Sequence, residues 1–231
     1  MRKKIEIRKL FSAYTPDQHM KRDIGVGLAI TAFAMVGIFA VSLAFGLIEV
    51  VGNGFNAKTI LFYTGLILVA AGWEEFLYRF ILLSLLIKVL KRPWIPLLLT
   101  AIVFGAMHAS NDHATWLSVV SNGLGGIMYG LAFIGTRKIW LPWALHFAWN
   151  YVQAPLLGFP VSGFEVEGIL KLKLLDHSWL SGGLYGPEGG IVGISFRIVV
   201  IALILLWINK SRGSFKNITQ ETPSGISQPP F

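Results

Sequence analysis

The chain has 231 residues, of which 54% are hydrophobic and only 14% are charged, and its mean hydropathy is +0.63. This composition differs from that of ordinary soluble domains and indicates one polytopic membrane domain with short tails. The chain contains no cysteine, which excludes disulfides, thiolate metal sites and cysteine nucleophiles. The net charge is +8, but the basic residues gather in the N-terminal tail and in short loops between apolar runs, so we expect no nucleic-acid partner.

The N-terminal part predicts a basic tail followed by two membrane spans. Residues 1–23 carry an excess of Lys and Arg, which is typical of a cytoplasmic tail beside an anionic membrane surface. The apolar run 24–48 is long enough to span a bilayer. Residues 49–57 contain Gly and Asn and predict a short outer loop. The next run, 58–90, is long for one span, so this helix must tilt or extend beyond the bilayer.

The middle of the chain predicts a third and a fourth span. Pro93 suits the first turn of the third helix, where its missing amide leaves no hydrogen bond unmade, and we expect the cluster 111–113 to end that helix. Residues 116–135 form the fourth span. Gly126 and Gly130 lie four residues apart in it and predict close contact with a neighbouring helix.

The C-terminal part predicts two more spans around a long outer loop. Residues 139–157 form the fifth span and 191–208 the sixth. The connecting segment 158–190 is rich in Gly, and the alternation of Lys and Leu over 171–174 predicts a short strand or interfacial segment. The polar tail 210–231 predicts disorder.

In this arrangement every Lys and Arg cluster lies on one side of the membrane, as the positive-inside rule requires. We therefore predict an all-α, polytopic membrane helical bundle of about six transmembrane helices, with both termini cytoplasmic and the chain multi-pass in the cell membrane. The helical domain covers residues 24–209, between the tails 1–23 and 210–231. Arg197 lies within the last span, and we expect its side chain to snorkel outward.

Two glutamates and an arginine interrupt the apolar run of the second helix. An acidic or basic residue at a bilayer centre costs roughly 2.5–3.5 kcal/mol on insertion scales, so these side chains must be paired, hidden from lipid or functional. Glu75 and Arg79 are four residues apart and share a helix face, which predicts an ion pair. Glu74 points about 100° away from Glu75 and has no charged partner on its own helix. The sequence thus predicts one neutralised carboxylate and one spare carboxylate.

Two histidines in other spans complete the set of intramembrane polar residues. His108 follows Phe104 by four residues, and His146 precedes Asn150 by four, so each pair shares a helix face. A carboxylate with a histidine can activate water, and a second histidine with an amide can donate to an oxyanion. A carboxylate with two histidines could equally bind zinc. Structural interpretations also stand: an ion pair that clamps helices, interior histidines, and a bridging Asn150.

The three motifs together resemble those of a known family. Glu74-Glu75-x-x-x-Arg79, Phe104-x-x-x-His108 and His146-x-x-x-Asn150 follow one another in the order seen in the CPBP family, the CAAX-processing and bacteriocin-processing (Abi) intramembrane proteases, which include the type II CAAX prenyl endopeptidases. They cover about 80 residues of the chain. The stretch 182–190 also resembles a segment that precedes the last helix in bacterial members.

The resemblance implies an intramembrane endopeptidase that hydrolyses a membrane-associated protein or peptide with glutamate-activated water. It implies that Glu74 is the general base, that His108 helps to hold the water, and that Arg79 orients the glutamate pair, which includes Glu75. His146 and Asn150 would form the oxyanion site. Members of the family are often labelled metalloproteases, so a divalent metal such as zinc is kept as an open alternative. The alternatives are a non-catalytic membrane scaffold or immunity protein of the same fold, and a proton- or cation-coupled transporter.

Overall fold

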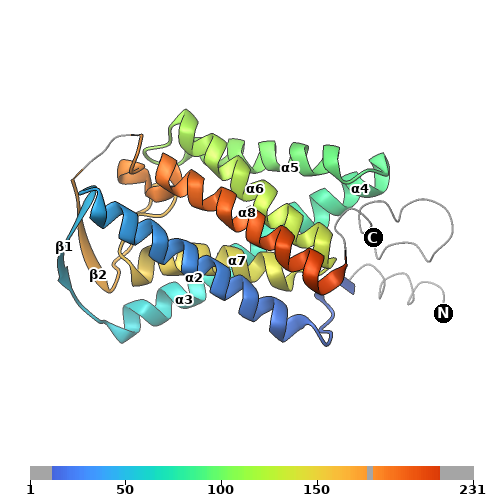
Figure 1. The fold of residues 1–231 in the computed structure, drawn as a ribbon, viewed down its shortest axis with the longest axis horizontal. Coiled ribbons are helices and arrows are strands. Elements are labelled where there is room, and N and C mark those ends of the chain that lie inside the picture. The colour runs from blue at the N-terminus through green and yellow to red at the C-terminus, as the bar shows by residue number, and fades with distance from the viewer. Residues whose placement is uncertain (1–11, 176–178, 214–231) are drawn as a thin grey trace.

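Helix α6 lies at the centre of the bundle (Figure 1), and 72% of its most apolar stretch is buried. Helices α5, α7 and α8 pack against it, and α2 and α3 pack against α7. The computed structural model describes residues 12–175 and 179–213. The helices of four or more residues and the strands in it are α2 (Met20–Ala44), β1 (Ile48–Asn53), α3 (Ala57–Glu75), η2 (Phe76–Leu83), α4 (Ser84–Leu90), α5 (Trp94–Met107), α6 (Trp116–Thr136), α7 (Trp140–Tyr151), η4 (Val152–Leu156), β2 (Leu170–Leu174) and α8 (Ile191–Arg212).

The close contact predicted from Gly126 and Gly130 is confirmed between α5 and α6. A Cβ added at Gly126 would lie 2.8 Å from the Cα of Ala101, and one added at Gly130 would strike the side chain of Leu97. At Gly126 the neighbouring backbone leaves room only for a hydrogen, whereas at Gly130 the neighbour is the end of the Leu97 side chain. The contact matters for the site because α5 and α6 form two of its walls.

The long second helix is confirmed, but it is not a regular α-helix throughout. Its helical run covers residues 57–90, with a π-helical segment, η2, inserted between α3 and α4. The π-segment begins directly after Glu75 and contains Arg79. Segments of π-helix are rare and occur often at functional sites, and no periodicity in this run predicted one.

A two-stranded antiparallel sheet lies at one end of the bundle (Figure 1). Strand β2 confirms the predicted strand near 171–174, and it pairs with β1 from Ile48 opposite Leu174 to Asn53 opposite Leu170. The predicted outer loop at 49–57 is therefore wrong for residues 49–53. The first helix also ends at Ala44 rather than at residue 48. Periodicity missed β1 because its partner is more than a hundred residues away.

The first and last helices meet at the opposite end of the bundle. Arg212 Nη2 lies 2.6 Å from Asp23 Oδ2, and the guanidinium of Arg22 lies 4.3 Å from the ring centroid of Trp207. The start of α2 and the end of α8 therefore lie on the same side, remote from the β-sheet (Figure 1). This arrangement agrees with the predicted location of both helix ends on one side of a membrane.

The predicted helical fold class is confirmed, apart from the small sheet. Among the described residues, three helices are long and apolar enough to cross a membrane, namely α2, α6 and α8. The other runs are shorter or are interrupted by π-helical segments, so the number of six spans stays a prediction. The predicted tails fall largely outside the described residues, at 1–11 and 214–231.

Candidate active site

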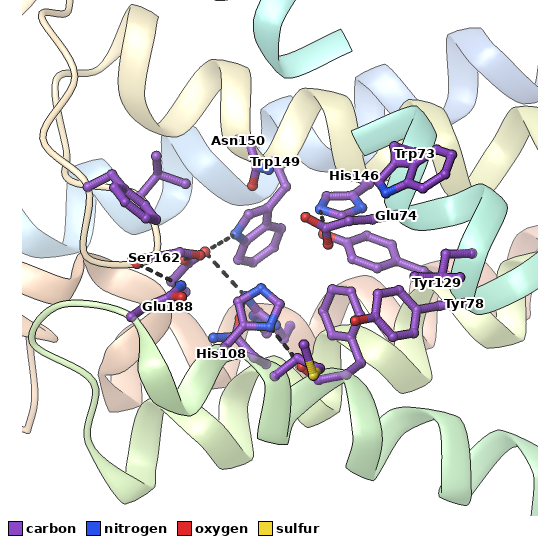
Figure 2. A pocket seen from close by; sticks show the side chains of 18 residues that line it. Trp73, Glu74, Tyr78, His108, Tyr129, His146, Trp149, Asn150, Ser162 and Glu188 are labelled. Carbon is purple, nitrogen blue, oxygen red and sulfur yellow. Dashed lines mark hydrogen bonds and ion pairs between the residues drawn. The ribbon is translucent and has the colours of Figure 1, made fainter. Parts of the chain in front are cut away.

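A cavity of about 460 Å³ lies between the helices and the segment that precedes α8 (Figure 2). Four of the predicted site residues line it, although they come from three separate helical runs: Glu74, His108, His146 and Asn150. Glu75 and Arg79 are not part of the lining. Their side chains lie behind it, with 0% and 2% of their surface exposed. The fold therefore brings all six predicted residues to one place, in two layers.

The predicted ion pair is confirmed, and it has a third member. Arg79 Nη1 lies 3.3 Å from Glu75 Oε1, and His146 Nδ1 lies 2.8 Å from the same oxygen. The guanidinium also lies 4.6 Å from the ring centroid of Phe104 and 5.2 Å from that of Tyr129. Aromatic faces attract a cation, so Arg79 is neutralised by Glu75 and enclosed by rings, which fixes the position of Glu75.

Glu74 differs from Glu75 in its exposure and in its distance from the nearest basic group. Its side chain is 33% exposed and lines the cavity. Its Oε2 has no hydrogen-bond partner among the described residues, and the nearest cationic or imidazole nitrogen is Nε2 of His146 at 3.9 Å. The spare carboxylate predicted from the sequence is therefore the one that faces open space.

The hydrogen bond to Glu75 limits the protonation states of His146. An ionised carboxylate only accepts hydrogen bonds, so Nδ1 of His146 must carry the hydrogen. Its Nε2, which faces Glu74, is then a bare acceptor in the neutral imidazole and a donor in the imidazolium. The ring also stacks on Tyr129, with centroids 4.5 Å apart. The 3.9 Å between Nε2 of His146 and Oε2 of Glu74 is too long for a direct hydrogen bond.

His108 lies at the end of α5, where the helix tightens into a short 3₁₀ turn, His108–Ser110. The amide of His108 turns to the carbonyl of Gly105, which leaves the carbonyl of Phe104 free of its usual α-helical partner. The Nδ1–H of His108 donates to that carbonyl at 2.7 Å. Because a carbonyl only accepts, Nε2 of the neutral ring is an acceptor. The spacing of four between Phe104 and His108 thus has a structural cause.

The zinc alternative has no ready binding site in this arrangement. A hydrolytic zinc site needs three protein ligands around one point. Within residues 12–175 and 179–213, no group of three or more His, Asp or Glu side chains could hold a metal ion. His146 directs its Nδ1 to Glu75, and His108 directs its Nδ1 to a carbonyl. The donor set in this geometry does not fit a zinc ion.

A second polar cluster lines the other side of the cavity, and the sequence prediction for it was wrong. Arg197 does not snorkel outward, because its side chain is 2% exposed and its Nη2 lies 3.4 Å from Oε2 of Glu188. Its Nη1 also donates to the carbonyl of Ser121 at 2.6 Å. An arginine inside an apolar span costs free energy unless it is paired, so the position of Arg197 in the sequence already indicated an acidic partner. The partner is Glu188, nine residues earlier in the segment 182–190.

Glu188 accepts hydrogen bonds from three elements, of which Arg197 in α8 is the first. The indole Nε1 of Trp149 donates to its Oε2 at 3.1 Å, and the hydroxyl of Ser162 donates to its Oε1. Near it, Asn122 Nδ2 donates to the hydroxyl of Tyr185 at 2.6 Å. Burial and, second, the charge of Glu188 raise the pKa of Tyr185 to about 12, so this phenol stays protonated at neutral pH. The cluster joins α6, α7 and α8 to the segment before α8.

Comparison with known proteins supports the resemblance read from the motifs. Residues 56–152 match the family described as Rce1-like, type II CAAX prenyl endopeptidase Rce1-like. The predicted family is confirmed over this segment. The match contains all six predicted site residues and ends before Glu188 and Arg197. No curated protein and no solved structure matches the chain significantly.

Proposed function

We propose that the protein is an intramembrane endopeptidase in which Glu74 activates the attacking water. The observation that carries this proposal is the difference in burial and pairing between the two adjacent glutamates. Glu75 is buried and bound by Arg79 and His146, whereas Glu74 lines the cavity, is 33% exposed and lies 3.9 Å from the nearest basic nitrogen among the described residues. A general base needs a free lone pair directed at water, and Glu74 meets this requirement.

In the proposed reaction, Glu74 takes a proton from water as the water oxygen bonds to the carbonyl carbon of the peptide. His108 helps to hold that water through its acceptor nitrogen. The oxyanion that forms accepts hydrogen bonds from the Nε2–H of protonated His146 and from the amide of Asn150. The proton on Glu74 then passes to the leaving nitrogen as the carbon–nitrogen bond breaks. Arg79 and Glu75 hold His146 in place for these steps.

The mouth of the cavity supports a membrane-associated protein or peptide as the substrate. Three of the lining residues are large, apolar and exposed: Trp73 is 62% exposed, Met107 is 60% and Phe164 is 57%. Large exposed apolar side chains beside a cavity suit contact with lipid or an apolar ligand. The protein would act as a multi-pass enzyme of the cell membrane, with its substrate reaching Glu74 from the apolar phase.

The test is a peptide-library cleavage assay on the purified protein in detergent. We expect the wild type to release fragments and Glu74→Gln to release none while unfolding at the same temperature. Glu49→Gln changes an exposed glutamate of β1 in the same way and serves as the matched control, with activity kept. Cleavage by Glu74→Gln at the wild-type rate would overturn the proposal. A cellular phenotype that survives Glu74→Gln would favour the scaffold alternative.

A further inference from the structure

A tight turn in the segment between α7 and α8 forms part of the cavity wall. Residues 161–164, which we name the wall turn, close on themselves: Val161 N donates to Phe164 O at 3.0 Å, and Phe164 N donates to Val161 O at 2.9 Å. Both central residues have positive φ, 51° at Ser162 and 86° at Gly163. Positive φ at both central positions is the pattern of a type I′ turn, and it is costly for a serine.

The strained conformation at Ser162 persists because neighbouring groups hold the wall turn on one side. Asn111 Nδ2 donates to the carbonyl of Ser162 at 3.0 Å. A Cβ on Gly163 would lie 2.9 Å from the carbonyl carbon of Asp112, so the turn packs directly on this backbone. Asn111 and Asp112 follow the 3₁₀ turn that carries His108. This side of the wall turn is therefore tied to the segment that presents His108.

The other side of the wall turn is tied to Glu188. The hydroxyl of Ser162 donates to Oε1 of Glu188, and Gly163 N donates to the carbonyl of Tyr185 at 3.0 Å. The second carboxylate oxygen of Glu188 accepts from Trp149. Trp149 is fully buried, and on α7 it stands directly before Asn150. A single carboxylate thus joins the wall turn to the helix that carries His146.

We propose that Glu188 is a positioning residue that fixes the wall turn against α7, and that the wall turn selects an apolar substrate side chain next to the scissile bond. Val161 and Phe164 of this turn line the cavity together with Met107, so the surface offered is apolar. Backbone strain that is held by surrounding contacts clusters at ligand-binding sites. The selectivity part rests on the proposed peptidase function, whereas the positioning part does not.

The test compares two buried carboxylates that each pair with an arginine of α8. Glu188→Gln keeps the shape of the side chain and removes its charge. Asp23→Asn does the same to the pair with Arg212, at the start of α2 and away from the cavity. Both variants should lose thermal stability. Only Glu188→Gln should weaken the preference for large apolar residues in a peptide library, by roughly tenfold in kcat/KM against small residues.

A reporter independent of activity tests the position of the wall turn. The chain has no cysteine, so Val161→Cys is a unique label site. We expect a thiol reagent to modify this cysteine several-fold faster in the double variant with Glu188→Gln than in the double variant with Asp23→Asn. If Glu188→Gln does not fold, Ser162→Ala removes one hydrogen bond from the same contact and should give the same two changes to a smaller degree.

The outcomes separate this inference from the proposed function. Equal labelling in the Glu188→Gln and Asp23→Asn backgrounds would overturn the positioning role. Faster labelling with an unchanged library profile would overturn the selectivity role. A wild type that cleaves no peptide would refute the proposed function and with it the selectivity role, while the labelling result would still decide whether Glu188 holds the wall turn.

Discussion

His146 Nδ1 lies 2.8 Å from Oε1 of Glu75, whereas its Nε2 lies 3.9 Å from Oε2 of Glu74. One imidazole therefore contacts both adjacent glutamates, with a hydrogen bond to the first and a looser approach to the second. The bond to Glu75 sets which nitrogen of His146 carries the hydrogen, as second-layer carboxylates do for other functional histidines. The two glutamates consequently have separable roles, which mutagenesis can distinguish.

We expect Glu74→Gln to abolish hydrolysis with little change in thermal unfolding, because Gln cannot accept the proton from water. Glu75→Gln should destabilise the protein by roughly 3–5 kcal/mol, since it leaves Arg79 buried without its counter-charge. Its activity loss should follow its loss of stability. Turnover and thermal unfolding in detergent, measured on both variants, check this. A stable but inactive Glu75→Gln beside an active Glu74→Gln would reverse the assignment.

Metal removal should leave the activity unchanged. Glu74, His108 and His146 do not converge as three ligands in the described structure, and the proposed water activation uses no metal. The measurement is cleavage after dialysis against EDTA, with and without added zinc, and metal content by mass spectrometry. Activity that disappears on chelation and returns with zinc would contradict the proposed mechanism and favour the zinc alternative that the sequence left open.

Accessibility labelling should confirm that the β-sheet and the end of α8 lie on opposite sides of the membrane. On the cysteine-free chain, Lys171→Cys in β2 should react with an impermeant thiol reagent added to intact cells. Lys210→Cys, near the end of α8, should react only after the cells are opened. Both lysines are exposed, so burial does not explain a difference. Labelling of the residue-210 cysteine from outside would contradict the predicted topology.

A methyl group at Gly126 should loosen the walls of the active site. Gly126→Ala directs a Cβ to within 2.8 Å of the Ala101 backbone, and such overpacking typically costs about 1–3 kcal/mol. Gly65→Ala is the matched control, because a Cβ at Gly65 meets nothing within 4 Å. Thermal unfolding of both variants checks the prediction. Equal unfolding temperatures would contradict the prediction, because they would mean that α5 and α6 move apart around the methyl group without loss of thermal stability.

The helical runs and the grouping of the site residues were predictable because hydropathy and charge act locally. The length of an apolar run predicts a membrane span. An unpaired charge within a span, such as Glu74, requires polar surroundings. The link between Glu75 and His146 was not predictable, since 71 residues separate them and no periodicity sets the rotation of one helix against another. The resemblance implied an oxyanion role for His146, and the structure shows that His146 also binds Glu75.

Glu188 and the wall turn were missed for a different reason. The Glu188–Arg197 pair joins a Gly-rich irregular segment to a regular helix, and a pattern search within helices does not pair such residues. The cost of a charge in a span applies to Arg197 as much as to Glu74. A search for the nearest acidic residue in the chain would have found Glu188. Ser162 carries no comparable signal, because its partners Asn111 and Glu188 lie far from it in the chain.

The π-helical segment η2 contains more residues per turn than an α-helix, because its hydrogen bonds run from i to i+5. Removing one residue between Glu75 and Arg79 would let the run close towards a regular α-helix and would turn Arg79 by up to about 100° relative to Glu75. Downstream of the segment lies only the short α4 before the chain turns into α5. Single-residue insertions and deletions should therefore disrupt the site between Glu75 and Arg79 and be tolerated after Leu83, so the end of this helix at Leu90 can vary in length without moving the glutamate pair.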